Sequence, residues 1–205
     1  TPPQNFIKKD NQTIFPLSGI SNKKTILCNE HGYFAIYDSD RYGFNNPDSE
    51  WDKEQIEFLL AGDSFAHGYC VNTPNSIAGN LRKFSNGKGT ITLGQIGNGP
   101  LIEYASLREY LPLKKTKRVL VLDISHKSFG ISAEILATIF EKCHNSLRSP
   151  PSRITNPDIP TPTSFALSKY YYPNKNDICN EIFRMLGIKN KIYKEMSSKE
   201  YYQDQ

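Results

Sequence analysis

A serine that follows a short apolar run is the residue of this chain best suited to act as a nucleophile. The run is Phe58 to Ala61, and Gly62, Asp63 and Ser64 come directly after it. A continuous apolar stretch of this length is typical of a strand covered on both faces of a parallel sheet. Glycine permits a tight turn from a strand into a helix, and aspartate favours a helix start. We therefore expect the Ser64 hydroxyl to be exposed at a strand end, beside N–H groups that favour a developing negative charge.

A glycine-rich loop is expected at the same edge of the sheet. Thr90 to Leu93 is predicted to be a strand, and Gly94 to Pro100 the loop at its carboxyl end. Since ligands of parallel sheets bind at the carboxyl ends of the strands, Ser64 and Gly97 both fall in the favoured region. Phosphate or nucleotide binding by this loop is a weaker alternative, because no Gly-x-x-x-x-Gly-Lys-Ser/Thr or Gly-x-Gly-x-x-Gly motif is present. A plain turn with a helix cap is the alternative for Gly-Asp-Ser itself.

A serine nucleophile needs a general base, and histidine is the usual one. His67 lies three residues after Ser64 on the same helical side and could reach its hydroxyl, but a surface position is favoured, because a base this close in sequence rarely has the attack geometry. His126 follows the third predicted strand, with Asp123 as an orienting partner, and is our candidate base. The other two histidines are interpreted as a turn residue and a charged helix end, at His31 and His144.

Three blocks in the same order resemble a bacterial branch of the SGNH/GDSL hydrolases. They are Arg41 to Pro47, Gly62-Asp63-Ser64, and Leu93 to Leu111. The resemblance covers roughly residues 25 to 122 and implies a serine hydrolase acting on esters of small acyl groups, including those of carbohydrates. By this resemblance Ser64 would be the nucleophile, the Gly97 N–H the second oxyanion donor, and Asn98 a neighbouring amide of the site.

Two later blocks of that family are not matched. Where the family has Gly-Asn-Asp after the third strand, this chain has Asp123-Ile124-Ser125-His126. A late Asp-x-x-His block is also missing, which implies a domain that is incomplete at its C-terminal end. Because a serine without a base is a poor nucleophile, we expect impaired activity. The alternative hypothesis is an inactive SGNH-like binding module or a truncated remnant.

Strand starts recur about every 30 residues with helices between them, which predicts an α/β fold built from βαβ units. We expect a three-layer, flavodoxin-like parallel sheet with helices on both faces. Residues 51–205 are predicted to form this domain, and residues 1–50 an irregular arm and a hairpin packed on it. The elements are expected at 25–28 and 33–37 (hairpin), 56–61, 90–93 and 119–122 (strands), and 75–85, 101–111 and 131–140 (helices).

Segments around the third strand and after it are less regular. Lys114 to Arg118 is predicted to be a solvated loop, and Ser149 to Thr163 a long proline-rich loop. A further helix is expected to be capped by Asp177 and to end at Gly187, after which Ile188 to Tyr193 begins a fourth strand.

Composition is that of a globular chain without a strong charge bias. The net charge of +4 favours neither a nucleic-acid nor a membrane-surface partner. No apolar run is long enough for a membrane span, and the polar first residues do not form a signal peptide. The four cysteines form no C-x-x-C pair, which argues against a zinc ribbon and gives no disulfide framework: Cys28, Cys70, Cys143 and Cys179. We expect free thiols, with one bridge left open. We predict no metal and no cofactor. Compartment and oligomeric state are left open.

Overall fold

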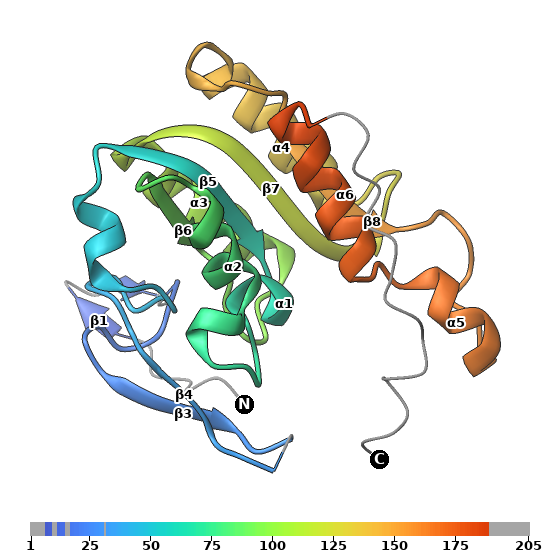
Figure 1. The fold of residues 1–205 in the computed structure, drawn as a ribbon, viewed down its shortest axis with the longest axis horizontal. Helices are drawn as coiled ribbons and strands as arrows, with labels where there is room; N and C mark the ends of the chain where they lie inside the picture. The colour runs from blue at the N-terminus through green and yellow to red at the C-terminus, as the bar shows by residue number, and fades with distance from the viewer. Residues whose placement is uncertain (1–6, 10–11, 15–16, 31, 189–205) are drawn as a thin grey trace.

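The computed structural model describes residues 7–9, 12–14, 17–30 and 32–188. Its main sheet has four strands, all parallel, in the order β6-β5-β7-β8 (Figure 1). The strands are β5 (Gln55–Gly62), β6 (Gly89–Thr92), β7 (Lys115–His126) and β8 (Ser152–Asn156). The predicted α/β fold with a parallel sheet is confirmed.

The order of the strands creates a switch point at the centre of the sheet. From β5 the chain first adds β6 on one side, and then crosses to the other side to add β7 and β8. The carboxyl ends of β5 and β7 are direct neighbours there, since Gly62 is paired with Leu122. In open α/β sheets this is the place where ligands bind.

Helices cover both faces of the sheet because neighbouring residues of its strands point to opposite sides. Leu59 and Val119 pack in a core with α3 (Pro100–Tyr110) and α4 (Ile131–Cys143). Leu60 and Leu120 pack on the other face, in a core with α1 (Ser64–His67), α2 (Ile77–Phe84) and α6 (Lys175–Leu186). Each such side chain contributes roughly 1.5–3 kcal/mol on full burial.

The basic run before the third strand is part of that strand, so the predicted loop is wrong. β7 already begins at Lys115, and Arg118 within it is buried. The Arg118 guanidinium contacts the buried Glu57 carboxylate on β5 and donates from Nε to Met185 O at 2.8 Å. A charged side chain can be buried here because a neighbouring strand supplies its counter-ion.

The proline-rich segment also contains regular structure that the sequence analysis missed. β8 lies within it and is parallel to β7, with Asn156 Nδ2 donating to Ile124 O at 2.6 Å. A short helix, α5 (Phe165–Tyr171), follows the segment. The prolines that flank β8 at Pro151 and Pro157 limit the strand to five residues at the edge of the sheet.

Smaller predictions have mixed outcomes. The hairpin is confirmed as β3 (Lys24–Cys28) and β4 (Ala35–Asp38), and the arm before it contains a short antiparallel pair, β1 (Ile7–Lys9) and β2 (Gln12–Ile14). α6 does end at Gly187, with φ of 70°, but its N-cap is Asn174, and Asp177 bonds back to the Asn174 N–H. The strand expected from 188 to 193 lies almost wholly outside the described residues. In the part of the chain that the structure describes, every helix is too short or too polar to cross a membrane.

Candidate functional site at the carboxyl edge of the sheet

Ser64 begins the one-turn helix α1 at the carboxyl end of β5. The helix is capped by Asp63, whose Oδ1 accepts from the Phe65 N–H at 3.0 Å. Gly62 has φ of 150°, and a side chain there would place its Cβ 2.3 Å from Leu122 O. Only glycine fits this turn, which brings the half-buried Ser64 to the edge of the sheet.

The loop after β6 lies at the same edge. Gln95 N donates to Gly62 O at 3.4 Å, directly before the Asp63–Ser64 turn. Gly97 has φ of 72° and is exposed, and the Asn98 Nδ2 is buried without a hydrogen-bond partner among the described residues. The structure therefore brings Ser64 and the Gly97–Asn98 loop to one edge, while their roles in catalysis stay predictions.

The candidate base is bonded elsewhere. His126 is exposed, and its Nδ1 lies 3.0 Å from Pro157 O. Pro157 directly follows β8, which pairs with β7 on the side away from β5. Asp123 does not orient it, because its carboxylate accepts from the Ser125 N–H, the Ser125 hydroxyl and the Ser132 N–H. The structure thus gives His126 contacts to the β8 side of the sheet.

The other histidines are also placed away from a role as base. His67 is fully buried against Tyr37, with ring centroids 5.1 Å apart, and burial lowers its pKa to about 4. The Nδ1 of His144 lies 3.1 Å from Phe140 O. His31 lies outside the described residues.

Three carboxyl groups gather at this edge, a feature that the sequence analysis did not find. Burial raises the pKa of Asp63, with a smaller contribution from the charge of Asp123. Glu103, in the first turn of α3, is 5% exposed, and burial together with the charges of Asp123 and Asp63 raises its pKa to about 8. Glu103 is therefore protonated at neutral pH. The three residues are 40 and 20 positions apart in the chain, and only the sheet brings them together.

A cavity opens at the switch point between β5 and β7. It has room of about 80 Å³ for the centres of water-sized molecules. Its walls are mainly apolar, and its acidic members are Asp63 and Asp123. Neither Ser64 nor Gly97 lines it. No three His, Cys, Asp or Glu side chains in the described part of the chain are grouped as a metal ion would require.

Two asparagines before Pro47 form side-chain hydrogen bonds to the backbone of α1 and β6. Asn45 Nδ2 donates to His67 O at 2.9 Å, and its Oδ1 accepts from Thr73 Oγ1 at 2.8 Å. Asn46 bonds both the N–H and the O of Thr92 in β6. The sequence showed these residues only as part of a turn-rich loop, since nothing local indicates their distant partners.

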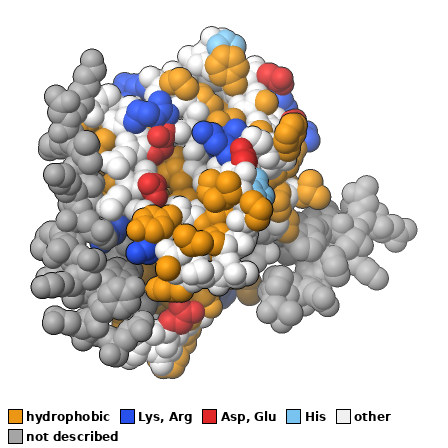
Figure 2. All heavy atoms as spheres, turned by 90° about the vertical axis from the view of Figure 1, so that its right-hand side faces the viewer, with side chains coloured by type: hydrophobic (Ala, Val, Ile, Leu, Met, Phe, Trp, Pro, Cys, Tyr) orange, Lys and Arg blue, Asp and Glu red, His pale blue; other side chains and the backbone are white. Residues whose placement is uncertain are grey.

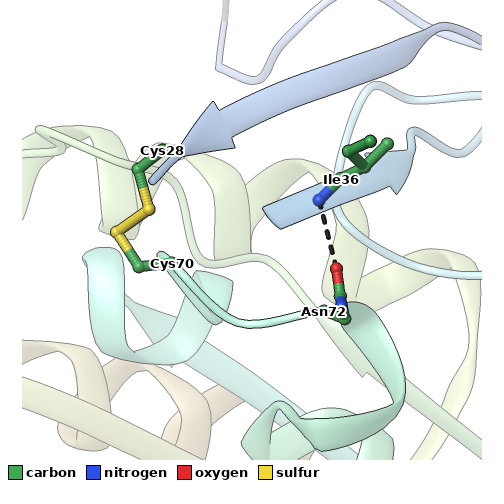
Figure 3. Close-up of a disulfide and its surroundings, with 4 residues drawn as sticks. All are labelled: Cys28, Ile36, Cys70 and Asn72. Atoms are coloured by element: carbon green, nitrogen blue, oxygen red, sulfur yellow. Dashed lines mark hydrogen bonds between the residues drawn. A yellow bond between two sulfur atoms is a disulfide. The ribbon is translucent and has the colours of Figure 1, made fainter. Parts of the chain in front are cut away.

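A disulfide ties the hairpin to the segment after α1, so the expectation of free thiols is wrong for this pair. Cys28 at the end of β3 is bonded to Cys70, whose Cα lies 5.4 Å away (Figure 3). Close by, Asn72 Oδ1 accepts from the Ile36 N–H at 3.2 Å. The two cysteines are 42 residues apart, and only the packing of the hairpin shows that they meet. Cys179 is free and partly buried.

The parallel sheet, its switch point and the cavity beside it define an open α/β protein of the doubly wound class. A family model described as "Transketolase, C-terminal domain" matches residues 109–178. The chain is 34% identical over 95 residues to the mitochondrial pyruvate dehydrogenase E1 component subunit beta of Chaetomium thermophilum, covering 42% of this chain and 25% of that protein.

Two further relatives are also named as beta subunits. The acetoin:2,6-dichlorophenolindophenol oxidoreductase subunit beta of Bacillus subtilis is 31% identical over 123 residues, covering 60% of this chain and 34% of that subunit. The mitochondrial 2-oxoisovalerate dehydrogenase subunit beta 2 of Arabidopsis thaliana is 39% identical over 70 residues, covering 34% and 19%. The chain thus spans between 19% and 34% of the length of these relatives.

These similarities overturn the resemblance to SGNH/GDSL hydrolases. The segment that departs from the hydrolase pattern, Asp123 to Ser128, lies inside the matched residues 109–178, which explains why the expected Gly-Asn-Asp is missing there. The predicted serine hydrolase acting on esters is therefore wrong, and so is its alternative, an inactive SGNH-like module. The predicted ester substrate loses its support with them.

Proposed function

We propose that this chain provides the C-terminal domain of a β-type subunit of a 2-oxoacid dehydrogenase, and that this domain joins a partner subunit. The matched residues 109–178 run from the end of α3 through β7, α4, β8 and α5 into α6. They include one complete βαβ unit, made of β7, α4 and β8, and such a unit packs as one segment. The relatives are named as subunits.

Exposed apolar side chains in the matched region support this proposal. Phe165, Leu167 and Tyr170 on α5 are 75%, 60% and 77% exposed. Figure 2 shows the side of the molecule that carries the C-terminal elements, and hydrophobic side chains gather in the middle of it. Exposed apolar and aromatic side chains in one region are typical of protein–protein interfaces.

Phe129 at the turn after β7 is the strongest single indication. Its ring is fully exposed, and its backbone has φ of 58°, a conformation that costs free energy in a bulky residue. Gly130 beside it leaves no room for a side chain, since a Cβ would lie 2.2 Å from His126 O. A fully exposed aromatic ring on a constrained backbone suits an interface anchor that is buried by a partner.

A segment exchange tests the proposal. Residues 109–178 replace the matching segment of the Bacillus subtilis β subunit, which is co-expressed with its companion subunit. We expect the chimera to co-purify with the companion and to reduce 2,6-dichlorophenolindophenol. The same chimera with Phe129→Ser and Phe165→Ser should lose co-purification, whereas a control with the exposed Thr163→Ser should keep it. A chimera with native circular dichroism that purifies alone would contradict the proposal.

A further inference from the structure

The cavity at the switch point has the features of a small-molecule site, and it does not depend on the proposed function. It lies between the ends of β5 and β7, and Ile154 of β8 and Ile178 of α6 also line it. Its apolar walls are supplied by parts of the chain that are far apart in sequence, from Phe65 to Ile178. Pockets of this kind, mostly apolar with a few polar groups, are the usual ligand sites of open α/β sheets.

The polar groups of the cavity are both acidic. Asp63 and Asp123 line it, and Glu103 is close enough for their charges to affect it. No ion pair joins any of these carboxyl groups to a lysine or arginine within the described residues. The Oε2 of the buried Glu103 also lacks a hydrogen-bond partner among those residues. A cation would relieve the repulsion between these groups, whereas an anion would increase it.

One carboxylate is available to meet a ligand. Asp123 already accepts three hydrogen bonds from Ser125 and Ser132. Asp63 accepts on Oδ1 from the Phe65 N–H at 3.0 Å, and its carboxylate also accepts from its own N–H. Asp63 therefore has more acceptor capacity left for a donor in the cavity than Asp123 has.

Aromatic side chains flank the same cavity. Phe65 and Tyr172 both line it, and they are 61% and 49% exposed, so their rings border its opening. A cation over an aromatic face is attracted by the ring, and ammonium groups are commonly recognised in this way. Apolar walls, aromatic rings and a carboxylate together favour an ammonium group attached to a compact hydrocarbon body.

We propose that this cavity binds small organic ammonium ions, with the ammonium group at Asp63 and the hydrocarbon between Leu122, Ile154 and Ile178. The centres of water-sized molecules can occupy about 80 Å³ of the cavity. This space admits a ligand of about five to eight non-hydrogen atoms.

Three probes of equal size test this site: n-butylammonium, 1-butanol and butanoate. Each is titrated at pH 7 and constant ionic strength into the full chain, and binding is followed by NMR chemical shifts. We expect n-butylammonium to bind with a Kd on the order of 1 mM, 1-butanol at least tenfold more weakly, and butanoate not at all. Equal shifts with all three probes, or no binding of n-butylammonium up to about 50 mM, would overturn the proposal.

Matched variants locate the binding. Asp63→Asn keeps a good N-cap for α1, so it should fold normally and weaken n-butylammonium at least tenfold. Ile178→Phe fills the cavity and should abolish binding of both n-butylammonium and 1-butanol. Glu54→Gln removes an exposed carboxylate at the opposite end of β5 and should leave the Kd unchanged. Equal weakening by Glu54→Gln and Asp63→Asn would show only general charge attraction and would overturn the site.

Discussion

The Asn46 side chain bonds to Thr92 as a residue of a further strand would. Its Nδ2 donates to Thr92 O at 3.0 Å, and its Oδ1 accepts from Thr92 N at 2.8 Å. Thr92 ends β6, an edge strand of the main sheet. The same oxygen accepts from the Arg82 guanidinium at 2.6 Å, and the same nitrogen donates to Asp40 Oδ2 at 2.8 Å. One amide thus satisfies the buried N–H and carbonyl of Thr92 at the open edge of β6, which would otherwise be unpaired.

We expect Asn46→Ala to lower the free energy of unfolding by about 2–4 kcal/mol, because it leaves the buried Thr92 N–H and the Nη2 of Arg82 without their acceptor. Urea denaturation followed by circular dichroism measures this change. Asn75→Ala, at an exposed position on the loop before α2, should change it by less than about 0.5 kcal/mol. Similar losses in the two variants would show that the pairing with Thr92 is unimportant.

The Cys28–Cys70 disulfide should stabilise the hairpin against the rest of the fold. Its cysteines are 42 residues apart, so the loop-closure model predicts a loss of about 3–4 kcal/mol for the double variant Cys28→Ser, Cys70→Ser. The measurement is the urea midpoint of the oxidised chain and of the double variant. Cys179→Ser removes a thiol that is free in the structure and serves as the control. An unchanged midpoint in the double variant would contradict the prediction.

Buried His67 should make the protein less stable in acid. Burial lowers its pKa to about 4, so between pH 6.5 and 4 the unfolded chain binds a proton that the folded chain does not. The free energy of unfolding therefore falls as the pH drops through this range, by about 2–3 kcal/mol from this group. We expect His67→Phe to remove that part of the slope between pH 7 and 4.5. His144→Gln, an exposed position, should retain it.

Glu103 should change the stability with pH in the opposite direction. Its pKa is raised to about 8 by burial and by the neighbouring carboxylates, so the folded chain holds a proton that the unfolded chain loses above pH 4.5. Stability from this group is complete below pH 4.5 and is lost as the pH rises to 8.

Glu103→Gln should therefore be more stable than the wild type by about 2–3 kcal/mol at pH 8 and equal to it at pH 4. Thermal unfolding at several pH values measures the difference. Glu109→Gln, on the exposed side of α3, is the matched control. A Glu103→Gln difference that does not grow between pH 4 and 8 would refute the prediction.

Ser64 offers a direct test of the corrected function. With His126 bonded to Pro157 O and His67 buried, we expect its hydroxyl to keep the low reactivity of an ordinary serine. Hydrolysis of 4-nitrophenyl acetate should proceed at the same rate in the wild type and in Ser64→Ala. A rate that falls more than about tenfold in Ser64→Ala would restore a catalytic role for this residue.

Short-range patterns were enough to find the elements whose geometry depends on neighbouring residues. Gly62 and Gly187 were recognised as turn and stop positions, and both have positive φ. β5 was found from its continuous apolar run, since a buried parallel strand needs apolar side chains on both faces. The family resemblance rested on such local blocks, and it is contradicted by the family model that matches residues 109–178.

The features that depend on distant partners were decided only by the tertiary structure. β8 forms in a proline-rich segment because β7 offers an open edge, and Arg118 is buried because Glu57 lies on the adjacent strand. The three carboxyl groups at the carboxyl edge come from the turn after β5, from α3 and from β7, and they meet only when the sheet assembles. A local pattern sets the shape that a segment prefers, whereas hydrogen-bond partners, counter-ions and cavities arise between segments that the sequence does not show to be neighbours.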